Sequence, residues 1–421
     1  MQPRSRNVVI VAEAPETLTM VCGISLLERL LRTLQRLGVR DVAIRSATSD
    51  HILEHLSRPS WARAEITVTL EARESRAFTA RDIAGPSLVL STGYYDHRLL
   101  APLLEVARTT FLIDSAPPAA LHPLLLRETR ESIGYLCRAA FVGAQWLDGA
   151  AADEPLWDQL TAAAEQNRIS VLDAAAVSPY VAGMRRSIRP VWLPAPAHQH
   201  LRAAEHLLLD AAQNGTLDLP AIVHGPIETA IIARLCRTSI TPNQITVFNG
   251  FVSVAVAVLF ASGHLAAGTV LALIVGVLDG LDGKQARVKV ETTPLGQYEH
   301  LLDYALELSW WAALAYHFTV SRQLPAAALL LALLVTTDLI DRAVKRRIKH
   351  LTGRNMDDVA PFERFVRLIG GRRNIYVWIF AAGLVLGIPY QGFGGLCWWG
   401  AVTASVHLVR AGFIAKRCRQ A

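Results

Sequence analysis

Residues 278–304 read LDGLDGKQARVKVETTPLGQYEHLLDY, directly after the apolar run VLALIVGV at 270–277. Four acidic residues of this stretch are spaced as two pairs: Asp279 with Asp282, and Glu299 with Asp303. Residues three or four positions apart share one face of a helix, so each pair presents its carboxylates together. The short connection between the pairs lets the two faces meet at one membrane edge. Each lone carboxylate inside a bilayer costs about 2.5–3.5 kcal/mol.

A positive charge is therefore expected between the four carboxylates. Hard divalent cations such as Mg²⁺ or Mn²⁺ take carboxylate oxygens as ligands, and two ions can share four such groups. The sequence favours this metal site, with Asp279, Asp282, Glu299 and Asp303 as ligands. Two alternatives stay open from the spacing alone. The acids can pair with the nearby cations Lys284, Arg287 and Lys289, or lie in water at the helix ends.

The second half of the chain consists of long apolar runs with few charges. Each run is close to the ~20 residues that a helix needs to cross a bilayer. They predict six transmembrane helices, at 244–262, 264–282, 297–318, 324–342, 374–391 and 393–414. We place the first half, 1–208, in a cytoplasmic α/β domain, 209–240 in a linker with an interfacial helix, and 241–421 in the membrane domain.

The basic residues predict the orientation. Ten Lys and Arg lie between Arg342 and Arg373, and further Lys and Arg follow the second and sixth predicted spans. By the positive-inside rule these segments and both termini face the cytoplasm, in an integral protein of the cytoplasmic (inner) membrane. The net charge of +6 suits a membrane surface or phosphorylated substrates better than nucleic acid. Five scattered cysteines without a CxxC pair argue against a disulfide framework or a zinc site.

The first half alternates apolar strand patterns with helical ones. Such alternation is typical of an α/β layered domain with a mostly parallel sheet. One of the helices is expected at 25–38, where leucines repeat on one face. The strands are expected at 8–12, 41–44, 66–70, 87–91, 110–114 and 169–173.

The string that begins at Asp279 resembles the signature of the CDP-alcohol phosphotransferase family, also known as phosphatidyltransferases. That signature is Asp-x-x-Asp-Gly-x-x-Ala-Arg, eight residues, Gly, and then two acids four apart. The residues that match are Asp279, Asp282, Gly283, Ala286, Arg287, Gly296 and Asp303. This chain departs from the pattern by one deleted residue before the third acid and by having glutamate there, at Glu299. The DGKQAR and TPLG segments particularly resemble the choline and ethanolamine phosphotransferases.

The resemblance implies transfer of a phosphate-linked alcohol from a CDP-alcohol to an acceptor hydroxyl, with release of CMP, in phospholipid or phospho-polyol synthesis. It implies Asp303 as general base and part of the metal site. Gly283, Ala286, Arg287 and Gly296 would lie along the CDP group; for the glycine and alanine, plain helix packing is an equal alternative. The acceptor is an alcohol, a phospho-polyol or a lipid, and a homodimer is one compatible assembly.

For the acceptor, cations near the metals are needed to bind phosphate. The best candidates are Lys345, Arg372 and Arg373, in a group with Asp338, Asp341, Arg342 and Arg346. The positive-inside rule alone also places cations here. His317 and His407 are expected to be packing residues rather than metal ligands.

The first half resembles sugar-phosphate nucleotidyltransferases in the order of its strands and in the helix GISLLERLLRTLQRLGV. The Gly-rich basic loop that would hold a nucleoside triphosphate is missing, and Pro194 and Pro196 stand where acids are usual. We therefore expect an inactive relative. The order of the two parts resembles bifunctional inositol-phosphate cytidylyltransferase/di-inositol-phosphate-phosphate synthases. Two alternatives are a bifunctional enzyme and a non-catalytic membrane scaffold or transporter, although a transporter would favour acids at the bilayer midplane.

Overall fold

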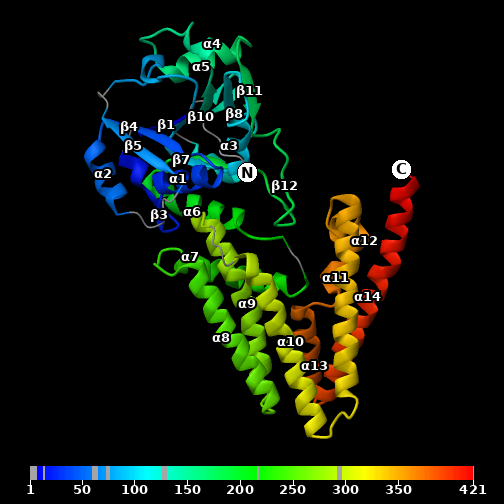
Figure 1. Ribbon diagram of the computed structural model, residues 1–421. Helices are drawn as coiled ribbons and strands as arrows, with labels where there is room; N and C mark the ends of the chain where they lie inside the picture. The colour runs from blue at the N-terminus through cyan, green and yellow to red at the C-terminus, as the bar shows by residue number, and fades with distance from the viewer. Residues whose placement is uncertain are drawn as a thin grey trace.

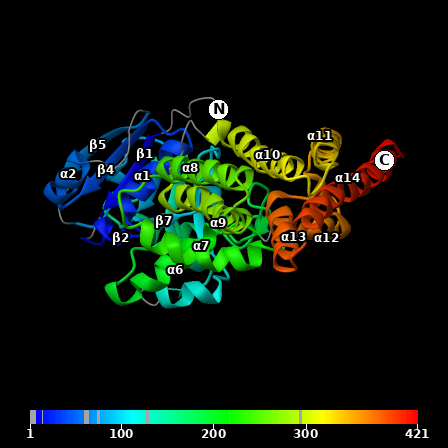
Figure 2. The same cartoon turned by 90° about the horizontal axis from the view of Figure 1, so that it is seen from below.

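The structure is a computed structural model with a sheet domain (residues 7–211) stacked on one end of a helical domain (residues 221–420), as Figure 1 shows. Seen along the helices from below, α8 (Pro242–Ala261) and α9 (Leu265–Lys289) lie on the side of the sheet domain, and α11 (Ala327–Thr352), α13 (Arg373–Val385) and α14 (Pro389–Gln420) lie farther from it (Figure 2). The structure describes residues 7–12, 15–58, 65–72, 76–125, 130–215, 218–291 and 296–420. Within these ranges, the side chains of 296–300 and 419–420 are not described.

The sheet domain is built on an eight-stranded sheet whose main path has the order β11-β8-β10-β6-β1-β4-β5. Every strand predicted from the sequence is present, and the pairings of β1 with β4 and β6, of β4 with β5 and of β8 with β11 are parallel, as predicted. The bounds are β1 (Asn7–Ala12), β4 (Asp41–Ser46), β5 (Thr67–Ala72), β6 (Ser87–Ser91), β8 (Thr110–Asp114), β9 (Arg130–Glu131), β10 (Gly134–Val142) and β11 (Ser170–Asp173).

Strand β10 was not predicted from the sequence; it runs antiparallel between β6 and β8. Three small pairs complete the strands: β2 (Met20–Val21) with β3 (Ile24–Ser25), β7 (Gly93–Tyr95) with β14 (Trp192–Pro194), and β12 (Tyr180–Val181) with β13 (Arg186–Ser187). The helices around the sheet are α1 (Leu26–Arg36), α2 (Ser49–Ser57), α3 (His97–Leu103), α4 (Ala144–Leu147), α5 (Leu156–Glu165) and α6 (Leu201–Ala211). Short 3₁₀ helices are η1 (Pro15–Leu18), η2 (Ala80–Asp82), η3 (Ala119–Leu124) and η4 (His198–His200).

Helix α1 forms where the leucine repeat predicted it. The Ser25 hydroxyl caps its first turn by accepting a hydrogen bond from the Glu28 amide at 3.1 Å, and the leucine face is fully buried against the sheet. The same buried cluster continues into the helical domain, because it includes Leu281 and Val288 of α9. The two domains thus share one hydrophobic core.

The helical domain places a helix at each of the six predicted spans. Its bounds are α7 (Ala221–Leu235), α8 (Pro242–Ala261), α9 (Leu265–Lys289), α10 (Gly296–Val320), α11 (Ala327–Thr352), η5 (Met356–Asp358), α12 (Pro361–Ile369), α13 (Arg373–Val385) and α14 (Pro389–Gln420). Among the described residues, α8 and α9 are long and apolar enough to cross a membrane, and α13 is a shorter apolar helix. The predicted interfacial helix corresponds to α7.

Several predicted boundaries differ from the helices, and two ends lie well beyond the prediction because charged helix-forming residues extend α9 and α11. The sequence placed a loop at 283–296, but α9 continues through GKQARVK to Lys289 and ends where Val290 adopts a left-handed conformation, φ 53°. Lys, Gln, Ala and Arg are good helix formers, so loss of hydrophobicity does not end the helix. Likewise α11 runs ten residues past the predicted end, to Thr352, and stops at Gly353.

The end of α9 is held by two buried arginines of α1. The Arg29 guanidinium donates to the carbonyl oxygen of Val288, and Arg32 donates to the carbonyl oxygen of Lys289 at 2.8 Å and to Glu291 at 3.0 Å. The last carbonyls of a helix lack intrahelical partners and carry partial negative charge, so cations stabilise them. The sheet domain therefore fixes the helix that carries Asp279 and Asp282.

Candidate active site

Helices α9, α10, α11 and α13 surround a cavity of about 420 Å³ that brings together residues from both halves of the predicted site. Asp279 of α9 and Asp303 of α10 lie on its wall together with all three predicted acceptor cations. The polar residues that line it are Arg185, Asp218, Asp279, Asp303, Tyr304, Glu307, Asp338, Asp341, Arg342, Lys345, Arg367, Arg372, Arg373, Asn374 and Tyr376. The acidic and basic side chains balance, six of each.

Asp279 forms an ion pair with Arg373, the first residue of α13. The Arg373 guanidinium lies 2.6 Å from Asp279 Oδ2. A carboxylate at the edge of apolar helices needs a compensating charge, and here a cation from another helix supplies it. The Asp279 carboxylate thus stabilises a positive charge at this point of the cavity, that of Arg373.

Asp282 is buried, 5 % exposed, and is not among the residues that line this cavity. Its carboxylate accepts a hydrogen bond from the Thr246 hydroxyl of α8 at 2.6 Å and one from the Gly283 amide at 2.6 Å. Thr246 was not among the predicted site residues; it ends the segment TPNQIT at 241–246, four residues after Pro242. The hydroxyl fixes the orientation of one carboxylate oxygen.

Two predicted residues cannot be placed. Gly296 and Glu299 lie in the first turn of α10, but their side-chain surroundings fall outside the described residues. Among the side chains that are described, no group of three or more His, Cys, Asp or Glu is close enough to hold a metal ion. The fourfold carboxylate site therefore stays a prediction.

Of the predicted nucleotide contacts, Gly283, Ala286 and Arg287 are not among the residues that line the acid cavity. The Nε of Arg287 donates to the Ala212 carbonyl oxygen at 2.8 Å, and Arg287 lines a different cavity, between α1, α6 and the end of α9. Gly283 is half-buried, and a Cβ there would meet only Arg287, at 3.3 Å. Ala286 is half-buried on the same helix.

Helix α7 packs closely against the glycine face of α9. A Cβ on Gly276 would lie 2.9 Å from the His224 ring, and one on Gly280 would lie 2.5 Å from the Glu228 carboxylate, so a larger residue at either position would push these side chains aside. Burial raises the pKa of Glu228 and lowers the pKa of His224. The sequence analysis treated α7 as an interfacial helix and did not predict that it brings these two side chains next to Asp279.

The remaining cations of the cavity are mostly paired. Lys345 lies 2.6 Å from Asp341, which also contacts His407 at 2.5 Å, and Arg342 lies 2.8 Å from Asp338. His407 is buried and bonded, as expected of a packing residue, and His317 packs against Gly263 and Phe318. Arg346, expected near this group, is not among the residues that line the cavity.

Arg372 differs from these cations. Its NH1 atom is buried and has no hydrogen-bond partner among the described residues. A buried cationic donor without an acceptor costs free energy that an anion would recover. Arg372 is therefore a candidate for binding a phosphate group in this cavity.

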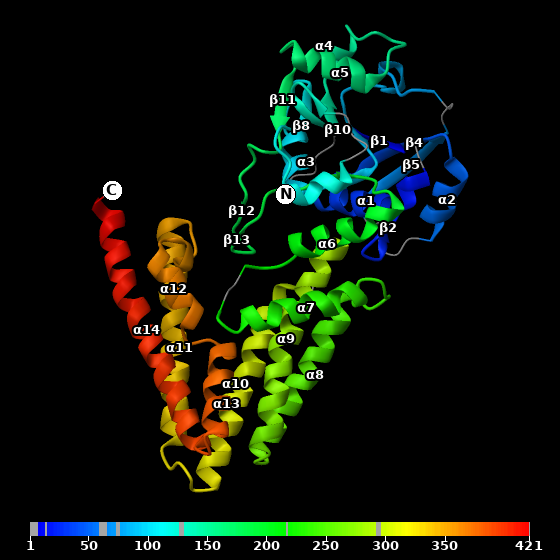
Figure 3. The ribbon, with the colours of Figure 1, turned by 180° about the vertical axis from the view of Figure 1, so that it is seen from behind.

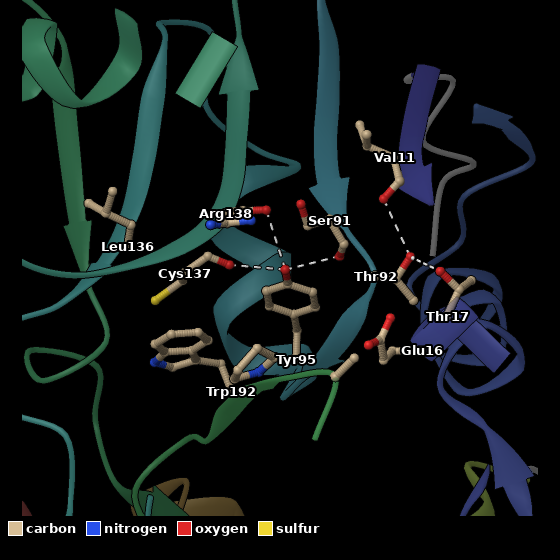
Figure 4. Close-up of a pocket in the computed structure, with 12 residues that line it drawn as sticks. Val11, Glu16, Thr17, Ser91, Thr92, Tyr95, Leu136, Cys137, Arg138 and Trp192 are labelled. Carbon is tan, nitrogen blue, oxygen red and sulfur yellow. Dashed lines mark hydrogen bonds between the residues drawn. The ribbon is translucent and has the colours of Figure 1, made fainter. Parts of the chain in front are cut away.

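The sheet domain has a crevice of its own, of about 240 Å³, at the ends of β1 and β6. Strand β1 pairs with β4 on one side and with β6 on the other, so the chain changes direction across the sheet at β1. Ligands of open α/β sheets bind at such a switch point. Figure 4 shows Tyr95 at its centre, donating toward the backbone carbonyl oxygens of Ser91 and Cys137 at 3.1 and 3.0 Å. Pro194 lines the crevice as well.

Comparison with known proteins agrees with the motif. Residues 239–340 match the CDP-alcohol phosphatidyltransferase family. Two relatives are both described as "Bifunctional IPC transferase and DIPP synthase". The one from Thermococcus kodakarensis is 30 % identical over 146 residues, 34 % of this chain and 33 % of the relative. The one from Rubrobacter xylanophilus is 26 % identical over 205 residues, 47 % of this chain and 43 % of the relative.

The matched region thus spans less than half the length of these relatives, and the C-terminal part of this chain carries a CDP-alcohol phosphatidyltransferase domain. Among solved structures, Mycobacterium tuberculosis phosphatidylinositol phosphate synthase with CDP-DAG bound is 22 % identical, with a TM-score of 0.35 over 46 % of this chain and 94 % of that one. HddC from Yersinia pseudotuberculosis is 11 % identical, with a TM-score of 0.33 over 48 % of this chain and 99 % of that one.

Proposed function

We propose that this protein is a membrane CDP-alcohol phosphotransferase that moves a phosphate-linked alcohol from a CDP-alcohol to an acceptor hydroxyl and releases CMP. One observation carries the proposal: Asp279 and Asp303, from the two halves of the motif, line the same cavity as Lys345, Arg372 and Arg373. Transfer between two phosphate-bearing substrates requires carboxylates that hold a metal ion, next to Lys and Arg side chains that hold phosphate groups. The family match over 239–340 supports the same reaction.

The four carboxylates of the motif are the chemical type of ligand that a divalent cation, Mg²⁺ or Mn²⁺, binds. Carboxylate oxygens are the ligands that these ions prefer, and Arg373 already places a positive charge 2.6 Å from Asp279. We assign the ion to Asp279, Asp282, Glu299 and Asp303. When bound, it neutralises negative charge that develops on the diphosphate as CMP leaves.

Asp303 is proposed as the general base. The acceptor hydroxyl loses its proton to Asp303 while its oxygen forms a bond to the phosphorus that carries the alcohol. The bridging P–O bond to CMP breaks, and CMP leaves with the electron pair. Lys345, Arg372 and Arg373 orient the acceptor, and Gly283, Ala286, Arg287 and Gly296 are assigned to the CDP group.

The surface of the helical domain supports a membrane location. Large apolar side chains of α8 are exposed, among them Phe248, Phe251 and Val258 at 57, 73 and 61 %, and an exposed apolar surface of this kind matches lipid. We propose that α8, α9, α10, α11, α13 and α14 all cross the cytoplasmic membrane. The basic segments and both termini then face the cytoplasm, and a homodimer is compatible with this arrangement.

The sheet domain is proposed to make no CDP-alcohol. Its crevice is lined by Glu16, by hydroxyl groups and by Pro194, and among its described lining residues Arg138 is the one cation. Gripping a nucleoside triphosphate needs several cations or a glycine-rich row of amide groups. A sheet fold persists without them, because its core does not depend on the site.

The test uses the purified full chain in detergent with radiolabelled CDP-alcohols, membrane lipids and phosphorylated polyols, and it measures CMP release. We expect acceptor-dependent release with Mg²⁺ for at least one pair of substrates, and its loss in Asp279→Asn. No CMP release with any pair would contradict the proposed function.

A further inference from the structure

The β12–β13 hairpin of the sheet domain extends to the helical domain, toward the end of α11 and α12 (Figures 1 and 3). At its turn, Arg185 lines the same cavity as Asp279 and Asp303. Its Nε atom lies 2.9 Å from Asp357 Oδ2, in η5. A residue of the sheet domain thus forms part of the wall of the transferase cavity.

The hairpin is anchored so that Arg185 is held in this place. The neighbouring Arg186 makes two hydrogen bonds to the Asp210 carboxylate of α6, at 3.0 and 3.1 Å. The amide of Gly215 donates to the Met184 carbonyl oxygen at 2.9 Å. Arg185 itself has φ 49°, a left-handed conformation that costs energy for any residue except glycine. Such strain persists where the surroundings fix it, and it is common at functional sites.

Three arginines converge here with too few acceptors. Arg367 NH1 lies 2.7 Å from Asp357 Oδ2, so a single carboxylate oxygen serves both Arg367 and Arg185. The Nε and NH2 atoms of Arg367 and the NH1 atom of Arg372 are buried without a hydrogen-bond partner among the described residues. Burial and the adjacent Arg372 and Arg185 lower the pKa of Arg367 to about 9, which reflects this crowding of positive charge.

We propose that Arg185, Arg367 and Arg372 form a receptor for the phosphomonoester of a water-soluble phosphorylated polyol, and that Arg185 makes the sheet domain a determinant of acceptor specificity. This inference rests on the proposed function and names its acceptor class. A phosphomonoester carries about two negative charges and three acceptor oxygens, which match the unpartnered N–H groups of the three guanidinium groups. The receptor lies where η5 and the hairpin meet, and both belong to the cytoplasmic side of the proposed topology, so the ligand is expected to arrive from water.

The test uses the full chain in detergent and four variants. Arg185→Gly removes the guanidinium and relieves the left-handed strain, so it is expected to fold at least as well as the wild type. Arg185→Lys keeps the charge without the two-pronged geometry. Arg367→Gln removes a second cation. The control is Arg168→Ala, which removes an exposed arginine of the same domain for which no partner is described.

Binding is measured first, by calorimetric titration with myo-inositol 1-phosphate, glycerol 3-phosphate and inorganic phosphate. We expect Arg185→Gly and Arg367→Gln each to weaken phosphomonoester binding by at least tenfold, Arg185→Lys to lie between, and the control to match the wild type. Unphosphorylated inositol and glycerol should not bind. Unchanged binding in Arg185→Gly, or equal binding of the unphosphorylated polyols, would overturn the proposal.

Turnover separates a soluble acceptor from a lipid one. CMP release is followed with the soluble phospho-polyols in one arm and with phosphatidic acid vesicles in the other. We expect release with a phospho-polyol, and in Arg185→Gly a KM for that acceptor raised at least tenfold, with kcat and the KM for the CDP-alcohol within twofold. Release with the vesicles alone would overturn the water-soluble acceptor. A wild type that binds the phosphomonoester but releases no CMP would contradict the transferase function and leave the receptor standing.

Discussion

Thr246→Val removes a single hydroxyl that the structure places on a proposed metal ligand. The Thr246 Oγ1 atom donates to Asp282 Oδ2 at 2.6 Å, and the carboxylate is 5 % exposed. Valine has nearly the shape of threonine, so helix packing between α8 and α9 is expected to survive. The variant removes the hydrogen bond that orients Asp282, together with a longer contact, at 3.2 Å, to the Pro242 carbonyl oxygen of the same helix.

The size of the effect follows from the charge of the acceptor. A hydrogen bond to a charged group contributes about 1.5–3 kcal/mol. Each 1.4 kcal/mol corresponds to a tenfold change, so loss of the bond amounts to about 10- to 100-fold, in line with the effect of losing a residue that orients a metal ligand. We expect this loss in the apparent affinity for Mg²⁺ and in kcat/KM, because a carboxylate that turns freely binds the ion less well.

The assay measures CMP release as a function of Mg²⁺ concentration in the wild type, Thr246→Val, Thr246→Ser and Thr269→Val. Serine keeps the hydroxyl and is expected to keep most of the activity. Thr269 of α9 is the matched control, because it is also buried and its hydroxyl donates only to its own helix, to the Leu265 carbonyl oxygen at 2.7 Å. Thr246→Val with Mg²⁺ dependence within twofold of the wild type would refute this role for Thr246 and Asp282.

Three further predictions concern the acids, the domain contact and the sheet domain. Asp282→Asn is expected to lower transfer by at least about a hundredfold while the protein still inserts into membranes; near-wild-type turnover would remove Asp282 from the site. Arg32→Ala breaks the contact with Lys289 and Glu291 and is expected to destabilise the protein by about 3 kcal/mol, because it leaves buried partners unpaired, whereas the exposed Arg36→Ala leaves the melting temperature unchanged; equal melting temperatures would contradict this. The full chain with CTP and phosphorylated alcohols, inositol phosphate included, is expected to release no pyrophosphate, and any release would favour a bifunctional enzyme.

A pH effect on stability is expected from His224. Burial holds its pKa below the ordinary 6.5, so the unfolded chain takes up a proton that the folded chain excludes. This contribution is fully present above pH 6.5 and is lost as the pH falls below it. The melting temperature should therefore fall less on acidification in His224→Gln than in the wild type; identical pH profiles would show that His224 does not contribute.

The periodicity of the sequence predicted most of the fold, because burial dominates both domains. The strands of the sheet are apolar runs bounded by polar residues, and the six predicted spans each coincide with a helix. The features that periodicity did not predict, β10 and the extension of α9, depend on residues distant in sequence. Strand β10 carries Arg138 at a bulge with φ 50°, which interrupts its alternation. The extension of α9 to Lys289 is stabilised by Arg29 and Arg32, which lie more than 250 residues earlier.

In the candidate site, too, the residues that local sequence patterns indicate differ from those that only the folded chain brings together. Asp279 and Asp303 line one cavity, and the motif pointed to both, because helical spacing and a short connection are properties of the local sequence. The cations Lys345, Arg372 and Arg373 line that cavity too, and their role in binding the acceptor stays a prediction. Arg185 could not be predicted, because only the folded hairpin of the sheet domain brings it there. One local signal was overlooked: Glu307 follows Asp303 by four residues and lines the same cavity.

The most direct test of the central claim measures acceptor-dependent CMP release by the wild type and by Asp303→Asn. Each protein is assayed with Mg²⁺, with excess chelator and after Mg²⁺ is restored. We expect release by the wild type that stops with chelator and returns with Mg²⁺, and at least about a hundredfold less release by Asp303→Asn than by the wild type whenever Mg²⁺ is present. Release that persists in excess chelator, or equal turnover in Asp303→Asn, would contradict a metal-dependent phosphotransferase that uses Asp303 as its base.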